Sequence, residues 1–514
     1  MALGKAIATI GGWTMLSRVT GLVREMLIAR YLGAGLVSDA FFVAFRFPNL
    51  FRSLFAEGAF NPAFVPLFAG KMEQEGLEAA RDFAERCQAV LVFALLGFVA
   101  LMEIIMPWAM YVLAPGFDDM PGKLELATEL SRITFPYLLF ISMVSLQSGV
   151  LNALGRFAAA AGTPVLLNIV SIAVLLILVP YMPTAGHAMA WGVFASGLAQ
   201  FAWLLFSMKK AGMSLRFVRP RMSPDVALML KRVVPGAVGA GVYQINLTVN
   251  TMIASKVANG AVSYLNYAER VNQLPLGVVG VAIGTALLPL LSRQLRSGDD
   301  RAAMESQNRA MEMGLLLTLP AAAALMTIAH PIIAVLFERG SFTSADTDAV
   351  ALALMVLASG LPAYVLVKVL TPGFFAREDT RTPVRVAGAC MALNIVINLA
   401  LMQPLGYLGM ALSTSLAAWA NVGALVWLLH RRGFFTIDSR LRTRMVRITA
   451  ACATMSGCLL MAMMVTEPLM TLPGLRVGAL ALLTVVGMGT YGAAVFLTGA
   501  AKLSELKGML RRRK

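Results

Sequence analysis

Apolar residues follow one another in long runs from the start of the chain to its end, separated by short polar stretches. Each run is long enough to cross the hydrocarbon layer of a membrane, which takes roughly 20 residues of α-helix. The runs lack the polar/apolar alternation of a β-barrel, and helices are the other structure that satisfies backbone hydrogen bonds in lipid. The pattern predicts an all-α integral membrane protein with fourteen transmembrane helices, at residues 6–30, 37–69, 84–113, 127–155, 160–182, 187–208, 226–255, 260–292, 303–336, 346–374, 382–403, 407–430, 443–465 and 473–499.

The composition of the chain agrees with a membrane protein. Of 514 residues, 58% are hydrophobic and 14% are charged, whereas about a quarter of a soluble domain is charged. A net charge of +16 would suggest nucleic-acid binding in a soluble protein, but here the basic residues gather in short loops, so we expect no nucleic-acid partner. The four cysteines lie in or beside apolar runs without metal-ligand spacing, and we predict core residues rather than disulfides or a metal site.

The loops alternate in charge along the chain. Basic residues concentrate around 71–81, 156, 209–221, 293–301, 377–381, 431–447 and 511–514. The intervening loops are acidic or poor in basic residues, at 33–38, 118–129, 182–187, 258–262, 338–348 and 466–473. Because basic loops stay on the cytoplasmic side, we predict that both termini are cytoplasmic. No loop is long enough to hold a soluble catalytic domain.

Short motifs recur in the same order in two halves of the chain. The residues 64–67 and 287–290 share a Pro-Leu ending, and 163–165 and 382–384 share Thr-Pro-Val. This order predicts a duplication, with an N-lobe of six helices at 1–222 and a C-lobe of six at 223–435. Residues 436–514 then carry two extra helices and a basic cytoplasmic tail. Duplicated halves favour a substrate site near the bilayer midplane, reached alternately from each side; the alternative is a chance resemblance among apolar helices.

Charged residues inside the first two segments are the most unusual feature of the sequence: Arg18, Arg24, Glu25, Asp39, Arg46, Arg52 and Glu57. Such groups are costly in lipid and usually face a water-filled cavity or a partner. We interpret Glu25 as a partner for an arginine. Arg46 and Arg52 have an alternative role, because long side chains near a helix end reach the interface. Prolines 48, 62 and 66, with Gly58, predict that the second segment is bent.

The second half contributes fewer charges. Glu269 and Arg270 lie in the eighth segment, where the repeat places the counterpart of the second segment. We therefore expect Arg270 to face the same cavity from the opposite lobe, the alternative being a local Glu–Arg pair that fixes helix packing. Lys368 is a weaker candidate. Glu103 is a lone acid, for which a packed carboxyl is favoured over a proton or cation site.

The sign of these charges indicates the substrate. Arginine stays charged and binds phosphate oxygens bidentately, so several arginines around one cavity fit a diphosphate or another polyanion on a lipid. A cation-coupled drug exporter would show acids and aromatic residues in their place. An enzyme would need a catalytic constellation, but the three histidines, His187, His330 and His430, are scattered near loops. The sequence therefore predicts a transporter with no catalytic residues and no cofactor.

Several motifs resemble those of one family: Ser17–Glu25, Ser38–Leu50 followed by Arg52, Phe55–Phe60, Leu113–Phe117, Tyr267–Arg270 and Lys368–Phe374. Over essentially its whole length the chain is similar to the MurJ (MviN) family of bacterial lipid II flippases. These belong to the multidrug/oligosaccharidyl-lipid/polysaccharide exporter superfamily. The resemblance implies two six-helix lobes arranged as a V, with two extra helices that form a groove for a polyprenyl tail.

The resemblance also implies a function. The cargo would be lipid II, the undecaprenyl-diphosphate-linked peptidoglycan precursor, moved from the inner to the outer leaflet of the bacterial inner membrane by alternating access. Its substrate-binding residues would be Arg18, Arg24, Asp39, Arg52 and Arg270, with Ser17, Glu57, Glu269 and Lys368 as secondary candidates. Asp39 would help to organise the cytoplasm-proximal gate.

Some consequences of the resemblance stay open. Many relatives are expected to have an acid where this chain has Gln273, so the role of Gln273 and Glu269 in gating is undecided. Coupling to the membrane potential and coupling to a monovalent cation are both compatible with the sequence. Cell-wall synthesis proteins are candidate partners. A flippase for another lipid-linked oligosaccharide is the nearest alternative function.

Overall fold

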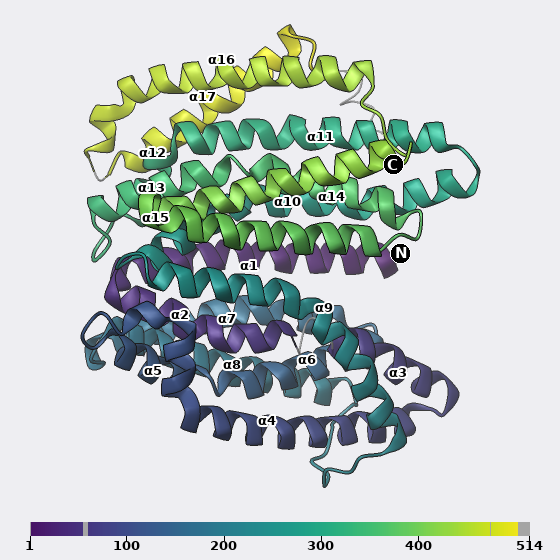
Figure 1. The fold of residues 1–514 in the computed structure, drawn as a ribbon. Helices are drawn as coiled ribbons and strands as arrows, with labels where there is room; N and C mark the ends of the chain where they lie inside the picture. Colours follow the sequence, from purple (N-terminus) through teal and green to yellow (C-terminus); the bar gives the residue numbers. More distant parts are fainter. Residues whose placement is uncertain (1, 55–59, 473, 502–514) are drawn as a thin grey trace. The chain divides into compact units, whose positions relative to one another are not determined.

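Every regular element that the computed structural model describes is a helix, as the sequence predicts (Figure 1). The structure describes residues 2–54, 60–472 and 474–501. The chain forms two compact units, one of residues 1–263 with 339–342, the other of residues 264–338 with 343–514. The lobe boundary at 222/223 stays a prediction; the compact units instead divide after Ser263.

The first unit contains nine α-helices and two short 3₁₀ turns within the described residues. They are α1 (Ala2–Leu32), α2 (Leu36–Phe51), α3 (Asn61–Gln74), α4 (Leu77–Leu113), η2 (Pro115–Phe117), α5 (Lys123–Thr134), α6 (Tyr137–Ala153), α7 (Phe157–Leu178), η3 (Val179–Tyr181), α8 (Ala185–Lys210) and α9 (Pro224–Ser255). The predicted segment 37–69 contains α2, which ends at Phe51, and α3, which begins at Asn61; Gly58 lies outside the described residues, and the bend there stays a prediction. Pro48 lies inside α2, and Pro62 occupies the first turn of α3, where a missing N–H costs least.

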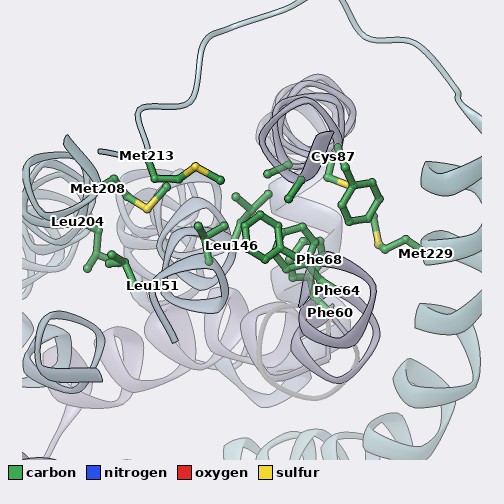
Figure 2. Packing of buried hydrophobic residues seen from close by; sticks show 14 of the residues in the cluster. Phe60, Phe64, Phe68, Cys87, Leu146, Leu151, Leu204, Met208, Met213 and Met229 are labelled. Atoms are coloured by element: carbon green, nitrogen blue, oxygen red, sulfur yellow. The ribbon is translucent and has the colours of Figure 1, made fainter. Parts of the chain in front are cut away.

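Phenylalanines at helical spacing form much of the core of this unit. Phe60, Phe64 and Phe68 are four residues apart and therefore share one face of α3. Their rings stack, with centroids 5.2 Å and 5.6 Å apart. Figure 2 shows these rings beside Cys87 of α4 and Met229 of α9, in the same cluster of buried residues.

Helix α9 belongs to the first unit by its contacts. Val226 and Met229 are buried in the cluster described above. Further along α9, Gln244 donates to the Ser53 hydroxyl at 2.7 Å, and Thr251 accepts a hydrogen bond from Arg46. Both apolar and polar contacts thus bind α9 to the segment from α2 to α4 within the first unit.

The second unit contains the remaining helices: α10 (Ala261–Arg296, whose first residues belong to the first unit), α11 (Asp300–Thr327), α12 (Ala329–Phe337), α13 (Ser344–Ala358), α14 (Leu361–Phe375), α15 (Arg381–Arg431), α16 (Ser439–Met470) and α17 (Arg476–Leu497). Gly406 interrupts α15 with a φ of 58°, a conformation that favours glycine. The interruption lies between the predicted segments 382–403 and 407–430.

Helices α16 and α17 pack side by side (Figure 1) and rest on α11. Ile448, Cys452 and Val495 are buried in this contact, and the Tyr491 hydroxyl donates to the Leu316 carbonyl at 2.6 Å. The burial of Cys87, Cys390 and Cys452 agrees with their predicted role as core residues.

Among the described residues, nine helices are long and apolar enough to cross a membrane. One of them, α15, spans two of the predicted segments. The predicted segments outside this set are 6–30, 37–69, 226–255 and 260–292, which coincide with α1, α2–α3, α9 and α10. Three of these four segments carry most of the charged candidate residues; Lys368 lies instead in the segment 346–374, which belongs to the set.

Candidate functional site

A buried ion pair lies in α1. The Arg24 Nη2 atom lies 2.8 Å from the Glu25 carboxylate, and the two residues are only 8% and 5% exposed. The Arg24 Nε atom is buried and has no hydrogen-bond partner among the described residues. Glu25 thus is the arginine partner that the sequence predicts, and Arg24 retains a donor for a further anionic group.

Two other candidates precede this pair on α1. Arg18 is half-buried, and within the described part of the chain its side chain has no ion pair. Ser17 is also half-buried, and its carbonyl accepts a hydrogen bond from Asn168 of α7 at 3.0 Å. This contact of Ser17 is a helix-packing contact made by its backbone.

The arginines of α2 have polar partners in the same unit. Arg52 Nε donates to the Asn49 side-chain oxygen at 2.9 Å, one turn earlier. Arg46 donates to Thr251 of α9, so it makes a helix–helix contact rather than only reaching an interface. Both are half-buried. Glu57 lies outside the described residues.

Asp39 is fully buried at the start of α2 and accepts four hydrogen bonds. The donors are Lys123 Nζ at 2.8 Å, the Gly260 N–H at 2.7 Å, and the N–H and hydroxyl of Ser263 at 2.9 Å and 2.6 Å. A buried carboxylate is tolerable when it is paired and its lone pairs are satisfied in this way. The network joins α2 to α5 and to the connection between α9 and α10.

Lys123 is a member of this network that the sequence did not single out. Its side chain is 1% exposed, donates also to the Asn259 side-chain oxygen at 2.9 Å, and lies 4.3 Å from the centre of the Phe117 ring. One feature of the sequence could have identified Lys123: it is a single lysine in a loop whose other charged residues are all acidic, namely Asp118, Asp119, Glu125 and Glu129.

The partners of Asp39 lie in two loops that the charge pattern places on one predicted side of the membrane. Asn259, Gly260 and Lys123 belong to the loops 258–262 and 118–129, which the charge pattern assigns to the non-cytoplasmic side. The predicted orientation and a cytoplasm-proximal gate at Asp39 are therefore two expectations that conflict, and both stay predictions.

The candidates of the second unit are more exposed. Glu269 is half-buried and accepts a hydrogen bond from Gln273 at 2.9 Å, one turn later on α10. Arg270 and Lys368 are exposed. Gln273 is thus a direct partner of Glu269, which favours a polar Glu269–Gln273 pair over an independent acid at either position.

A second polar cluster fixes a basic loop of this unit. Asp379 accepts hydrogen bonds from the Thr382 N–H at 2.9 Å and from Arg432 at 2.6 Å. Hydrogen bonds from Thr382 and then from Arg432 hold the pKa of Asp379 well below its usual range. The cluster connects the loop before α15 to the loop after it.

The chain matches one family model over residues 28–475, described as lipid II flippase MurJ. A protein of Rhizobium meliloti (strain 1021), named probable lipid II flippase MurJ, is 44% identical, and the match covers 100% of this chain and 97% of that protein. A solved structure, described as lipid II flippase MurJ in an inward closed conformation, is 26% identical with a TM-score of 0.77, covering 95% of this chain and 98% of that one.

A more distant structure shares the fold alone. It is described as the inward-facing conformation of a multidrug resistance MATE family transporter of the MOP superfamily. It is 14% identical, with a TM-score of 0.68, and the match covers 83% of this chain and 98% of that chain.

Proposed function

Because the chain belongs to the MurJ family of lipid II flippases, we propose that it moves lipid II from the inner to the outer leaflet of the bacterial inner membrane. The observation that carries this proposal is the family match over nearly the whole chain. The arginines of α1 and α2 support it, since a diphosphate needs bidentate cationic partners. The protein is a transporter and not an enzyme.

Fourteen crossings with both termini in the cytoplasm are the topology that this function implies. The helices support it, since all fourteen predicted segments coincide with helices or with parts of them. The alternation of loop charge supports the orientation. The enzymes that polymerise the delivered precursor are proposed partners, because they consume the product on the outer side.

Arg18, Arg24 and Arg52 are the proposed diphosphate ligands of the first unit, and Arg270 that of the second. Their exposure supports an order of action. Arg18 and Arg270 have side chains that solvent reaches, and we assign them to first capture, whereas Arg24 is buried and already neutralised by Glu25. Ser17, Glu57, Glu269 and Lys368 remain secondary ligands, Glu269 acting through its bond to Gln273.

The headgroup crosses by alternating access, while the polyprenyl tail stays in lipid. The Asp39–Lys123 network is the proposed closure on the outer side, because its partners lie in loops assigned there. For the headgroup to be released on that side, the hydrogen bonds that Gly260 and Ser263 donate to Asp39 must break and be replaced by hydrogen bonds to water. An inside-negative potential favours the return of an empty, positively charged carrier by about 2.3 kcal/mol per charge per 100 mV, so we propose coupling to the potential rather than to a bound cation.

Depletion of the protein in cells tests the cargo. Lipid II should accumulate in the inner leaflet and become inaccessible to a lipid II-binding probe added from outside. A plasmid copy of the chain should restore access, and an Arg24→Ala copy should not. If externally accessible lipid II stays normal while another polyprenyl-diphosphate oligosaccharide accumulates, the cargo is that oligosaccharide instead.

A further inference from the structure

The segment between α8 and α9 is an extended strap, residues 214–222, that is fixed at its first end. Just before the strap, Met213 is fully buried in the phenylalanine-rich cluster, as Figure 2 shows. The Gly212 carbonyl accepts a hydrogen bond from Arg81 at 2.8 Å. Within the strap, the Arg216 N–H donates to the buried Glu85 carboxylate at 2.9 Å. These contacts hold the strap against the first turns of α4.

The other end of the strap is also held. Ser223 caps α9, because its hydroxyl accepts the Val226 N–H at 3.4 Å. Asp225 forms an ion pair with Lys71 of α3 at 3.0 Å. Pro220 within the strap and Pro224 after it disfavour helix. The extended backbone is therefore a built feature of the first unit, and its side chains have a fixed direction.

Apolar and basic side chains of the strap both point into solvent. Phe217 is 70% exposed and Met222 is 63% exposed, and the three arginines of the strap, Arg216, Arg219 and Arg221, are exposed as well. Residues 207–222 contain five basic residues and no acidic one. Exposed phenylalanine beside unneutralised arginine is unfavourable on a surface that faces only water.

Several arginines of the other basic loops are held by carboxylates. Arg432 binds Asp379, Arg377 binds Asp300, and Arg440 binds Glu312. In the described part of the chain, no carboxylate pairs with the side chains of the three strap arginines. The strap therefore offers three guanidinium groups to an external anion, each with the planar fork that matches a phosphate.

We propose that the strap binds anionic phospholipid headgroups of the cytoplasmic leaflet. Its arginines contact the lipid phosphates, and Phe217 and Met222 enter the boundary between headgroups and acyl chains. The location supports this occupant, since the strap begins four residues after α8 ends at Lys210 and ends two residues before α9 begins at Pro224. Both neighbours are proposed membrane helices, so the strap lies at headgroup depth. The choice of the cytoplasmic leaflet depends on the orientation proposed above. The preference for anionic phospholipid does not depend on it.

A fluorophore on the strap tests the proposal in the full chain. Phe217→Cys in a Cys458→Ser background is labelled with an environment-sensitive dye, since the other three cysteines are buried. The protein is reconstituted into vesicles of phosphatidylcholine, with or without phosphatidylglycerol in both leaflets. We expect blue-shifted emission, and quenching by a lipid-attached quencher, that increase with phosphatidylglycerol and fall at high salt. Because both leaflets have the same composition, the insertion direction does not affect the result.

Two controls decide the outcome. Tyr181→Cys in the same background places the dye at a residue that is also highly exposed, 79%, at the end of η3 and away from any basic cluster, and its emission should not depend on phosphatidylglycerol. Combining Phe217→Cys with Arg216→Gln, Arg219→Gln and Arg221→Gln should abolish the dependence. Identical emission from position 217 in both vesicle types, or a dependence that survives the triple glutamine change, would overturn the proposal. A shift in both vesicle types that lacks salt sensitivity would also overturn it, because it indicates apolar insertion without anionic recognition.

Discussion

At the scale of single residues, the carboxylate of Glu25 determines how tightly Arg24 binds a substrate anion and how fast it releases it. Glu25 occupies one guanidinium edge at 2.8 Å, while Nε has no hydrogen-bond partner among the described residues. A substrate phosphate must therefore compete with a carboxylate that is always present. This competition weakens binding but speeds release, which a carrier needs as much as capture.

Replacing Glu25 with Gln should separate these two effects. The Glu25→Gln protein should bind lipid II about tenfold more tightly, since hydrogen bonds to charged groups contribute about 1.5–3 kcal/mol, and should turn over more slowly. Binding is measured by titration in detergent and turnover in vesicles. Glu103→Gln, a lone acid of α4, is the matched control. Weaker binding by Glu25→Gln would show that Glu25 only maintains the fold of α1.

Lys123 provides a second test at this scale. Lys123→Met leaves the Asp39 carboxylate buried with backbone and hydroxyl donors but no cation, and removing one partner of a buried pair costs about 3–5 kcal/mol. We expect a clear loss of thermal stability, measured by intrinsic fluorescence in detergent. Asp39→Asn in the same chain should restore part of it. Lys256→Met, at a nearby exposed lysine, should have little effect; an equal loss there would contradict a specific role of the pair.

At the scale of elements, polar clusters in loops fix how consecutive helices meet. Asp379 links the loop before α15 to Arg432 after it. Its folded pKa is depressed, so its contribution to stability is present above its unfolded pKa, about 3.9, and is lost as the pH falls through the lower folded pKa.

The Asp379→Asn protein should therefore be less stable than the parent at pH 7, with a difference that shrinks as the pH falls below about 4. Because Asp379 is partly exposed, the difference is small and is best followed as a shift in melting temperature across a pH series. Asp118→Asn, at an exposed position, serves as the control. A difference between the Asp379→Asn and parent proteins that is constant across the series would mean that the carboxylate charge contributes nothing.

The element scale also shows what the sequence could predict. Apolar runs predicted the nine helices that, among the described residues, are long and apolar enough to cross a membrane, and the gap at 404–406 corresponds to the interruption of α15 at Gly406. Local signals were sufficient there, because helix formation in lipid depends on runs of neighbouring residues. The extended strap had no such signal, since its arginines were counted only as loop charges.

Contacts between distant residues were beyond the sequence. Lys123 and Asp39 are 84 residues apart, and nothing in either motif pairs them. The sequence predicted Glu25 as a partner for an arginine but did not decide which one, and the structure pairs it with its neighbour Arg24. The assignment of α9 to the first unit follows from contacts to Ser53 and Arg46, which only the fold brings together.

At the scale of the whole molecule, we propose that arginines within the predicted membrane segments carry the diphosphate of lipid II across the membrane. Arg18 and Arg24 lie on α1, Arg52 directly follows α2, and Arg270 lies on α10. Family membership supplies the cargo, and the side chains supply the chemistry. If this is so, loss of the positive charge at these positions slows transport even in variants that fold normally.

Flipping of fluorescent lipid II in vesicles tests this claim most directly, with an impermeant reductant reporting which leaflet holds the label. The parent protein should flip the lipid, Arg24→Lys should retain a part of the rate, and Arg24→Ala and Arg18→Ala should each slow it at least tenfold, about 1.4 kcal/mol. Arg296→Gln, at an exposed arginine at the end of α10, should flip at the parent rate. Full-rate flipping by well-folded Arg18→Ala and Arg24→Ala proteins would contradict the arginine site.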